Sequence, residues 1–211
     1  MTKIESYGNK PTRDGFGLGL VELGEKDERI VVIGADVSGS VKTSYFRDKF
    51  PERFISVGVA EQNATTVAVG LALSGKVPFF AAFRNADQIR VSICYNEANV
   101  KIGGGHSGLT VGPDGATHQS LEEVAFLRTL PNMTLICPAD FEQAKKATVA
   151  MGEMVGPAYL RFGRPSVPMF TKPEDDFVIG KADILRTGND ISIVANGIMV
   201  WESLIAAEAL K

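Results

Sequence analysis

Short apolar, β-branched runs alternate along this chain with stretches of helical period, and that alternation restricts the fold more than any other feature. The run RIVVIGAD (29–36) is typical, because it reads as a buried strand that ends in a loop. Strands separated by single helices indicate right-handed β-α-β units, and wholly apolar strands are buried on both faces. The sequence therefore predicts an α/β fold, a doubly wound parallel sheet with helices on both faces.

The pattern places each expected element on a short range of residues. Strands are expected over 29–36, 54–58, 76–83, 99–104, 133–140 and 157–163. Helices are expected over 12–25, 44–50, 61–74, 84–97, 119–129 and 140–153. We find no internal repeat that would indicate a solenoid.

A second unit is expected near the end of the chain. The charged segment TKPEDDF (171–177) reads as a linker, and a strand (190–197) and a helix (198–211) are expected after it. One βα unit cannot bury its own faces. We therefore predict one domain over residues 1–175 and the incomplete start of a second over 176–211.

Composition and charge exclude several classes of protein. No apolar run reaches the ~18 residues that span a bilayer, and the N-terminus lacks an apolar signal core, so we expect a cytoplasmic protein without membrane contact. The net charge of −3 comes from interspersed acids and bases, which argues against nucleic-acid binding. Cys94 and Cys137 have neither metal nor redox spacing and are expected to be buried free thiols.

Ligands of open α/β sheets bind beyond the carboxyl ends of the strands, so the strand-to-helix junctions are the first places to search. Glu61 falls where the helix after strand 54–58 begins. An acid there is also explained by the helix dipole alone, which favours it by about 0.3–1 kcal/mol. Position therefore leaves a structural and a functional interpretation open.

The segment GGGHSGLTVGPDGATHQ (103–119) is the most unusual part of the chain, because it is rich in glycine and holds both histidines. A long glycine-rich loop inside a compact domain is usually functional. Three other interpretations stay open: a flexible loop with solvated histidines, a metal site of His106, Asp114 and His118 whose spacing matches no strong ligand pattern, and a phosphate loop, for which the usual glycine motif is missing.

Two arginines surround a glycine in RFGRPSVP (161–168), directly after the sixth expected strand. The planar guanidinium of arginine can bind two phosphate oxygens at once. Arg161 and Arg164 are therefore candidate phosphate ligands, and a pair of solvated surface charges is the alternative.

Several of these segments together resemble the pyrimidine-binding domain of transketolases, especially the separate C-terminal subunit of two-gene transketolases. The resemblance is carried by SVGVAEQNATTVAVGLALSG (56–75), by HSGLTVGPDGATHQSLEEVAFLRTLPNMTLICPAD (106–140) and by YLRFGRPSVP (159–168). The match runs in order along residues 11–211. The THQ ending of the glycine-rich segment favours transketolase over deoxyxylulose-phosphate synthase.

The resemblance implies roles for individual residues. Glu61 matches the glutamate that hydrogen-bonds the aminopyrimidine ring of thiamine diphosphate and drives its change of tautomer. His106 and His118 match histidines that face the substrate carbonyl and hydroxyls. Asp114 matches an aspartate that contacts a substrate hydroxyl.

Further residues match positions around the sugar phosphate and the cofactor. Arg164, and less closely Arg161, match an arginine that holds the phosphate. Arg13 and Ser40 align more loosely with other phosphate contacts, and Asp36 lies at a position near the cofactor and the subunit contact.

The chain also departs from the family in two places. After strand 76–83 the family has a longer loop with a phenylalanine that packs on the pyrimidine ring, whereas here Phe83 runs straight into RNADQIR (84–90). Phe83 is the substitute that we expect. The second departure is that nothing resembles the GDG…N motif that binds Mg²⁺ and the diphosphate. No metal site is therefore expected in this chain.

The resemblance implies a subunit of a transketolase, which transfers a two-carbon ketol unit from a ketose phosphate to an aldose phosphate. Thiamine diphosphate is the implied cofactor, with Mg²⁺ held mainly by a partner chain that carries the diphosphate-binding domain. A homodimer joined to that partner is expected, and activity is expected only after assembly. Two alternatives stay open: a related enzyme (deoxyxylulose-phosphate synthase or an oxo-acid dehydrogenase β subunit), or a non-catalytic domain that binds a partner.

Overall fold

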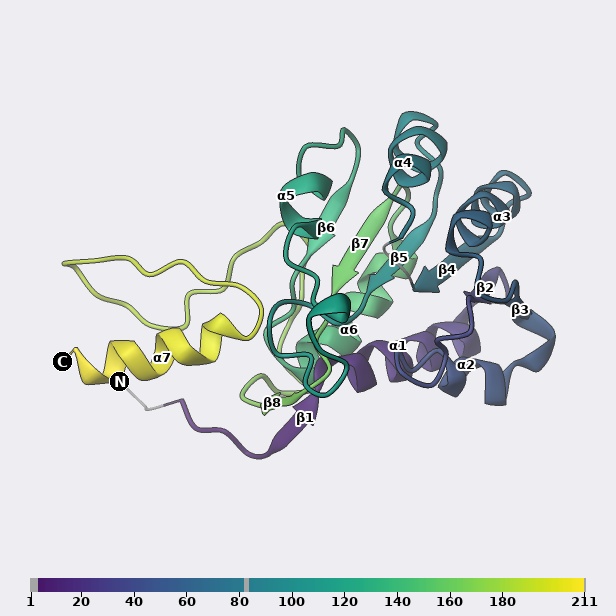
Figure 1. The fold of residues 1–211 in the computed structure, drawn as a ribbon. Helices are drawn as coiled ribbons and strands as arrows, with labels where there is room; N and C mark the ends of the chain where they lie inside the picture. Colours follow the sequence, from purple (N-terminus) through teal and green to yellow (C-terminus); the bar gives the residue numbers. More distant parts are fainter. Residues whose placement is uncertain (1–3, 82–83, 211) are drawn as a thin grey trace.

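A six-stranded parallel sheet forms the centre of the fold, in the strand order β3-β2-β4-β5-β7-β6 (Figure 1). The computed structural model describes residues 4–81 and 84–210. The strands are β2 (Ile30–Gly34), β3 (Phe54–Ser56), β4 (Val77–Ala81), β5 (Lys101–Gly104), β6 (Thr134–Ile136) and β7 (Ala158–Arg161). Every neighbouring pair in this sheet is parallel. The predicted doubly wound parallel sheet is confirmed.

Helices cover both faces of the sheet (Figure 1). The regular helices and short helical turns of the sheet domain are α1 (Thr12–Lys26), α2 (Ser44–Lys49), η1 (Pro51–Arg53), α3 (Glu61–Leu73), α4 (Ala86–Gln88), η2 (Ile89–Tyr95), η3 (Ala116–His118), α5 (Glu123–Leu127) and α6 (Phe141–Glu153). The helix expected over 119–129 is shorter and begins at Glu123. A 3₁₀ turn, η3, precedes it instead.

Two apolar layers hold these helices to the sheet. Phe16, Leu20 and Phe162 belong to the layer on the side of α1 and α6. Ile89, Ile93 and Tyr159 belong to the layer on the other side, beneath α3 and η2. Alternate residues of one strand enter opposite layers, as the pleat requires: Leu160 joins the first layer and Tyr159 the second.

Glycines on α1 let this helix approach α6 closely. A Cβ atom on Gly15 would lie 2.3 Å from the carbonyl oxygen of Phe141, and one on Gly19 would lie 2.6 Å from Cβ of Thr148. Glycine is unfavourable inside a helix by roughly 0.5–1 kcal/mol. Here the close contact between the two helices offsets that cost.

The buried carboxylate of Asp140 ties the start of α6 to the chain that follows the sheet. Its Oδ1 accepts from the backbone N of Gln143 at 3.0 Å and so caps the helix. Its Oδ2 accepts from the backbone N of Phe170 at 2.8 Å and of Thr171 at 2.7 Å. The segment after β7 is thereby held against the sheet domain.

A second, two-stranded sheet joins the two ends of this domain. Strand β1 (Asn9–Pro11) pairs antiparallel with β8 (Ser166–Pro168). The helix expected over 198–211 is present as α7 (Met199–Ala209). The prediction of a strand over 190–197 is wrong, because those residues pair with no other strand and Ile191 and Val194 are exposed. A strand needs a neighbour to satisfy its backbone groups, and the described residues supply none at this place.

None of the helices in the described ranges combines the length and the apolar character needed to cross a membrane. Cys94 is a buried free thiol, as expected, whereas the free thiol of Cys137 is only partly buried.

Candidate active site

The sequence-predicted site residues gather along one edge of the sheet. Asp36 follows β2, Glu61 follows β3 and His106 follows β5, while Arg161 ends β7. The strands are parallel, so their carboxyl ends share one edge, which is where open α/β sheets bind ligands. Phe83, the residue expected against the pyrimidine ring, lies outside the described residues.

Glycines at the end of β5 let this strand pack closely against its neighbours, and His106 follows directly after them. A Cβ atom on Gly103 would lie 2.7 Å from Phe16, and one on Gly104 would lie 1.8 Å from the hydroxyl of Tyr159. Larger residues would therefore push β5 away from its neighbours. His106 itself has a φ of 61°, a backbone conformation that non-glycine residues rarely adopt and that is frequent at functional sites.

Backbone hydrogen bonds close the base of the glycine-rich loop. The backbone N of Ser120 donates to the carbonyl of His106 at 3.2 Å, and the N of Gly108 donates to the carbonyl of Ser120 at 2.8 Å. The N of Ser107 donates to the carbonyl of Phe162 at 3.3 Å. The loop is thus anchored at its base and projects its tip over the edge of the sheet.

The loop and the segment after β7 bring four of the expected side chains together. The carboxylate of Asp114 accepts a hydrogen bond from Nη1 of Arg164. The same Oδ2 atom lies 3.6 Å from Nε2 of His106. The rings of His106 and His118 have centroids 6.2 Å apart. The expected closeness of His106, Asp114 and His118 is seen, whereas Glu61, expected at the rim of the same cleft, follows β3, three strands from β5.

The environment of His106 keeps its imidazole neutral. Burial is the largest cause that lowers its pKa, and the charges of Arg164, His118 and Arg13 lower it further. A neutral imidazole offers one N–H donor and one acceptor nitrogen. A neutral His106 can therefore donate a hydrogen bond to a carbonyl oxygen or accept one from a hydroxyl.

Arg13 lies close enough to His106 for its charge to lower the pKa of that imidazole. Its Nη1 donates to the carbonyl oxygen of Ser40 at 3.1 Å. Its Nε is buried and has no hydrogen-bond partner among the described residues. The hydroxyl of Ser40 donates to the carbonyl of Val37 at 2.9 Å. Ser40 thus orients Arg13 with its main chain, while the buried Nε of Arg13 is left without a partner among the described residues.

Arg161 faces a different partner. Its Nε donates to Oε1 of Glu123 at 2.5 Å, and its Nη2 donates to the carbonyl of Ser120 at 3.5 Å. The arrangement fastens the end of the glycine-rich loop to β7. The sequence did not single out Glu123, because it looks there like an ordinary acid on a helix surface. In the structure its side chain is only 1% exposed.

Glu61 begins α3 at some distance from the loop. Strand β3 is separated from β5 by β2 and β4, which corresponds to ~14 Å across the sheet. The carbonyl of Glu61 accepts from Oγ1 of Thr65 at 3.0 Å and from Nδ2 of Asn85 at 3.4 Å. Asn85 was not expected from the sequence. Its side chain is buried, and its Oδ1 has no hydrogen-bond partner in the described part of the chain.

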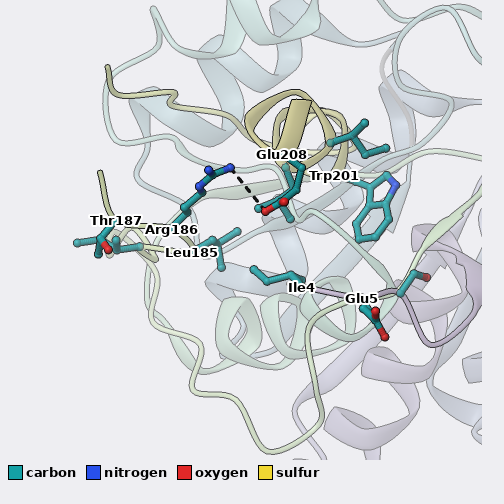
Figure 2. A pocket seen from close by; sticks show the side chains of 11 residues that line it. Ile4, Glu5, Leu185, Arg186, Thr187, Trp201 and Glu208 are labelled. Carbon is teal, nitrogen blue, oxygen red and sulfur yellow. Dashed lines mark ion pairs between the residues drawn. The ribbon is translucent and has the colours of Figure 1, made fainter. Parts of the chain in front are cut away.

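A cavity of about 740 Å³ lies elsewhere, between the N-terminal segment and α7 (Figure 2). Its apolar lining includes Ile4, Trp201 and Leu204. The ion pair between Arg186 and Glu208, 3.7 Å apart, lies at its side. No predicted site residue within the described ranges lines it, so volume alone does not identify the active site. Within residues 4–81 and 84–210, no three His, Cys, Asp or Glu side chains are grouped so that they could hold a metal ion.

Known proteins resemble this chain over most of its length. The family model of the transketolase pyrimidine-binding domain matches residues 9–169. The chain is 44% identical over 210 residues to the putative transketolase C-terminal section of Methanocaldococcus jannaschii, covering 96% of this chain and 66% of the relative. It is 41% identical to the 6-deoxy-6-sulfo-D-fructose transketolase subunit of a Clostridium species, covering 94% of this chain and 63% of the relative. The chain thus spans less than two thirds of the length of these relatives.

Solved structures show the same fold. One described as a split-gene transketolase, an inactive β4 tetramer, superposes with a TM-score of 0.88 at 44% identity, covering 96% of this chain and 68% of that chain. The transketolase of Campylobacter jejuni superposes with a TM-score of 0.70 at 24% identity, covering 83% of this chain and 29% of that chain, which shows the fold alone. This chain therefore belongs to the transketolase family and carries its pyrimidine-binding domain over residues 9–169.

Proposed function

We propose that this chain is the pyrimidine-binding subunit of a two-chain transketolase that moves a two-carbon ketol unit from a ketose phosphate to an aldose phosphate. The observation that carries the proposal is the convergence of His106, Asp114 and Arg164 at the carboxyl edge of the sheet. These three side chains offer a hydrogen-bond donor for a carbonyl, an acceptor for a hydroxyl and a cation for a phosphate.

Glu61 is proposed to hold a proton at a ring nitrogen of the aminopyrimidine. Thiamine diphosphate, when bound, would supply the nucleophilic carbon that attacks the ketose carbonyl. The fit is supported by the half-buried position of Glu61 at the start of α3. The unpartnered, buried Oδ1 of Asn85 beside it marks a place where a further polar group can be bound. Asp36, exposed after β2, and Phe83 are proposed to contact the cofactor as well.

The substrate end of the site is assigned to the loop and to the arginines. His106 and His118 would hydrogen-bond the carbonyl and hydroxyl oxygens, and Asp114 would accept from a hydroxyl. Arg164 would hold the phosphate. Arg13, positioned by Ser40, would add a second cation, because its Nε has no partner among the described residues. Arg161 is proposed to shape the loop through Glu123, since its guanidinium is engaged there.

Assembly with other chains is part of the proposal. The family match covers the pyrimidine-binding domain, so we assign Mg²⁺ and the diphosphate to a partner chain. A homodimer is supported by large apolar side chains left exposed near α3 and η2: Val59 is 71%, Leu73 77% and Tyr95 80% exposed. A cytoplasmic location stays a prediction.

The division into domains is also a proposal. Residues 1–175 would form the pyrimidine-binding domain, and 176–211 would be the first part of the transketolase C-terminal domain. Ile184 and Ile191, each 83% exposed, support this division, because a completed sheet would bury side chains of this kind. The cavity beside Trp201 lies in the same region (Figure 2).

A comparison of donors tests the proposal. The chain is combined with a partner that carries a diphosphate-binding domain, thiamine diphosphate and Mg²⁺, and product is measured in a coupled assay. We expect transfer from xylulose 5-phosphate to ribose 5-phosphate and none from pyruvate. Turnover with pyruvate instead would identify a related thiamine-diphosphate enzyme, and no turnover with any donor would favour a non-catalytic partner-binding domain.

A further inference from the structure

The carboxylate of Asp114 occupies the place on Arg164 where an anion would bind. Its Oδ2 accepts from Nη1 of Arg164 and also lies 3.6 Å from Nε2 of His106. The Asp114 side chain is 32% exposed and that of Arg164 is 29% exposed, so solvent reaches the pair. Exposed ion pairs are weak, typically 0–1 kcal/mol, and exchange readily.

The surroundings favour an anion with more charge than a carboxylate. Arg13 lies near enough to lower the pKa of His106, as Arg164 and His118 do. The buried Nε of Arg13 has no hydrogen-bond partner among the described residues. With Arg13 and Arg164 as cations against the single charge of Asp114, an excess of positive charge remains. A phosphate carries up to two charges and more acceptor oxygens, so it competes well for a guanidinium.

The backbone around Asp114 can release it. Gly112 has a φ of 87° and Gly115 a φ of 73°, and a Cβ atom added at either would meet no atom within 4 Å. The N of Gly115 donates to the carbonyl of Gly112 at 3.1 Å, so Asp114 sits on a tight turn at the loop tip. Glycines in this conformation at both ends provide hinges for a small rotation of the turn.

We propose that Asp114 is an exchangeable counter-ion, which pairs with Arg164 until a phosphate group binds there and displaces it. Displacement frees the carboxylate to accept from a hydroxyl of the same ligand. Ligands without a phosphate cannot displace it, so the exchange favours phosphorylated ligands. The identity of the ligand as a sugar phosphate rests on the proposed function, whereas the exchange of anions does not.

Titration of the 211-residue chain with inorganic phosphate tests the exchange. Isothermal calorimetry at constant ionic strength would compare the wild type with Asp114→Asn and Arg164→Gln. We expect Asp114→Asn to tighten phosphate binding about twofold to fivefold, because the competing charge is gone while the shape of the side chain is kept. Asp48→Asn is the matched control: Asp48 is exposed and pairs with Arg47 at 3.0 Å, so the same change of charge should leave phosphate affinity unaltered.

The double variant Asp114→Asn/Arg164→Gln locates the phosphate. If the double variant loses the phosphate affinity that Asp114→Asn gained, the anion binds at Arg164, as expected. Retention of that affinity shows an adventitious ion only and overturns the proposal, as does unchanged or weaker binding to Asp114→Asn in a variant whose circular dichroism spectrum is native. A missing transketolase activity would overturn the proposed function and leave these binding outcomes untouched.

Discussion

Nε of Arg161 donates to Oε1 of Glu123 across 2.5 Å, although the Glu123 side chain is only 1% exposed. A buried carboxylate needs such a partner, because an unpaired charge in the interior is costly. The second oxygen of Glu123 has no hydrogen-bond partner among the described residues, which leaves Arg161 as the group that balances its charge. The pair joins the end of β7 to the start of α5, the helix that follows the glycine-rich loop.

Removing Arg161 should therefore destabilise the chain. We expect Arg161→Ala to lower the free energy of unfolding by about 2–4 kcal/mol, since it leaves the Glu123 carboxylate buried and unpaired. The double variant Arg161→Met/Glu123→Gln should lose less than that single variant, because no buried charge remains. Urea unfolding monitored by circular dichroism measures both. A single variant within 0.5 kcal/mol of the wild type would show that the pair is not needed for stability.

Two glycines in helices should respond in opposite directions to alanine. Gly19→Ala places a methyl group 2.6 Å from Cβ of Thr148 at the α1–α6 contact, so we expect a loss of about 1–3 kcal/mol. Gly70 on α3 has no atom within 4 Å of an added Cβ, and alanine there should stabilise by about 0.5–1 kcal/mol through its higher helix propensity. Thermal unfolding of the two variants measures the contrast. If Gly19→Ala stabilised the chain as much as Gly70→Ala, the α1–α6 contact would tolerate the added methyl group, contrary to this prediction.

Lys101 should make stability depend on pH. Its side chain is fully buried, its Nζ donates to the carbonyls of Met154 at 2.9 Å and Gly156 at 2.6 Å, and burial lowers its pKa to about 7. Between that value and the ordinary lysine pKa of about 10.4, the unfolded chain binds more protons than the folded chain, so the unfolding free energy should rise with pH. The control is Lys101→Met, whose stability should lack this contribution over the range from about pH 7 to 10. If the unfolding free energies of the wild type and of Lys101→Met changed in parallel with pH, the lowered pKa of Lys101 would be contradicted.

The isolated chain should bind thiamine diphosphate weakly or not at all. The diphosphate needs a divalent cation with oxygen ligands, and we assign that cation to the partner chain. Calorimetry with thiamine diphosphate and Mg²⁺ should show no micromolar binding until a partner with the diphosphate-binding domain is added. Micromolar, Mg²⁺-dependent binding to the chain alone would show that it holds both ends of the cofactor.

The sheet could be predicted from the sequence because each strand is a local apolar run. Strand β2 and helix α3 lie within about two residues of their predicted ranges. The strand expected over 190–197 failed because a local pattern cannot say whether a neighbouring strand is present. Arg161 pairs with Glu123, which lies 38 residues away in the sequence. The pair depends on how β7 and α5 pack in the fold, so it could not be predicted from the spacing of the two residues.

The site could be predicted only in part. His106, Asp114 and His118 share one glycine-rich segment, so their convergence follows from the loop itself. The contact of Arg164 with Asp114 joins residues 50 apart and depends on β5 and β7 being neighbours in the sheet. Asn85 was missed because a buried amide beside Glu61 looks like any loop residue in the sequence.

Glu61→Ala tests the central claim most directly. The Glu61 side chain is only half-buried, and the hydrogen bonds from Thr65 and Asn85 are accepted by its backbone carbonyl, which alanine keeps. The variant should therefore fold normally, within about 1 kcal/mol of the wild type. In the assembled enzyme we expect transfer from xylulose 5-phosphate to ribose 5-phosphate to fall below about one hundredth of the wild-type rate, as for a lost proton-transfer group. Near-normal transfer by Glu61→Ala with thiamine diphosphate bound would contradict the role given to Glu61 and with it the claim that this chain activates the aminopyrimidine through that carboxylate.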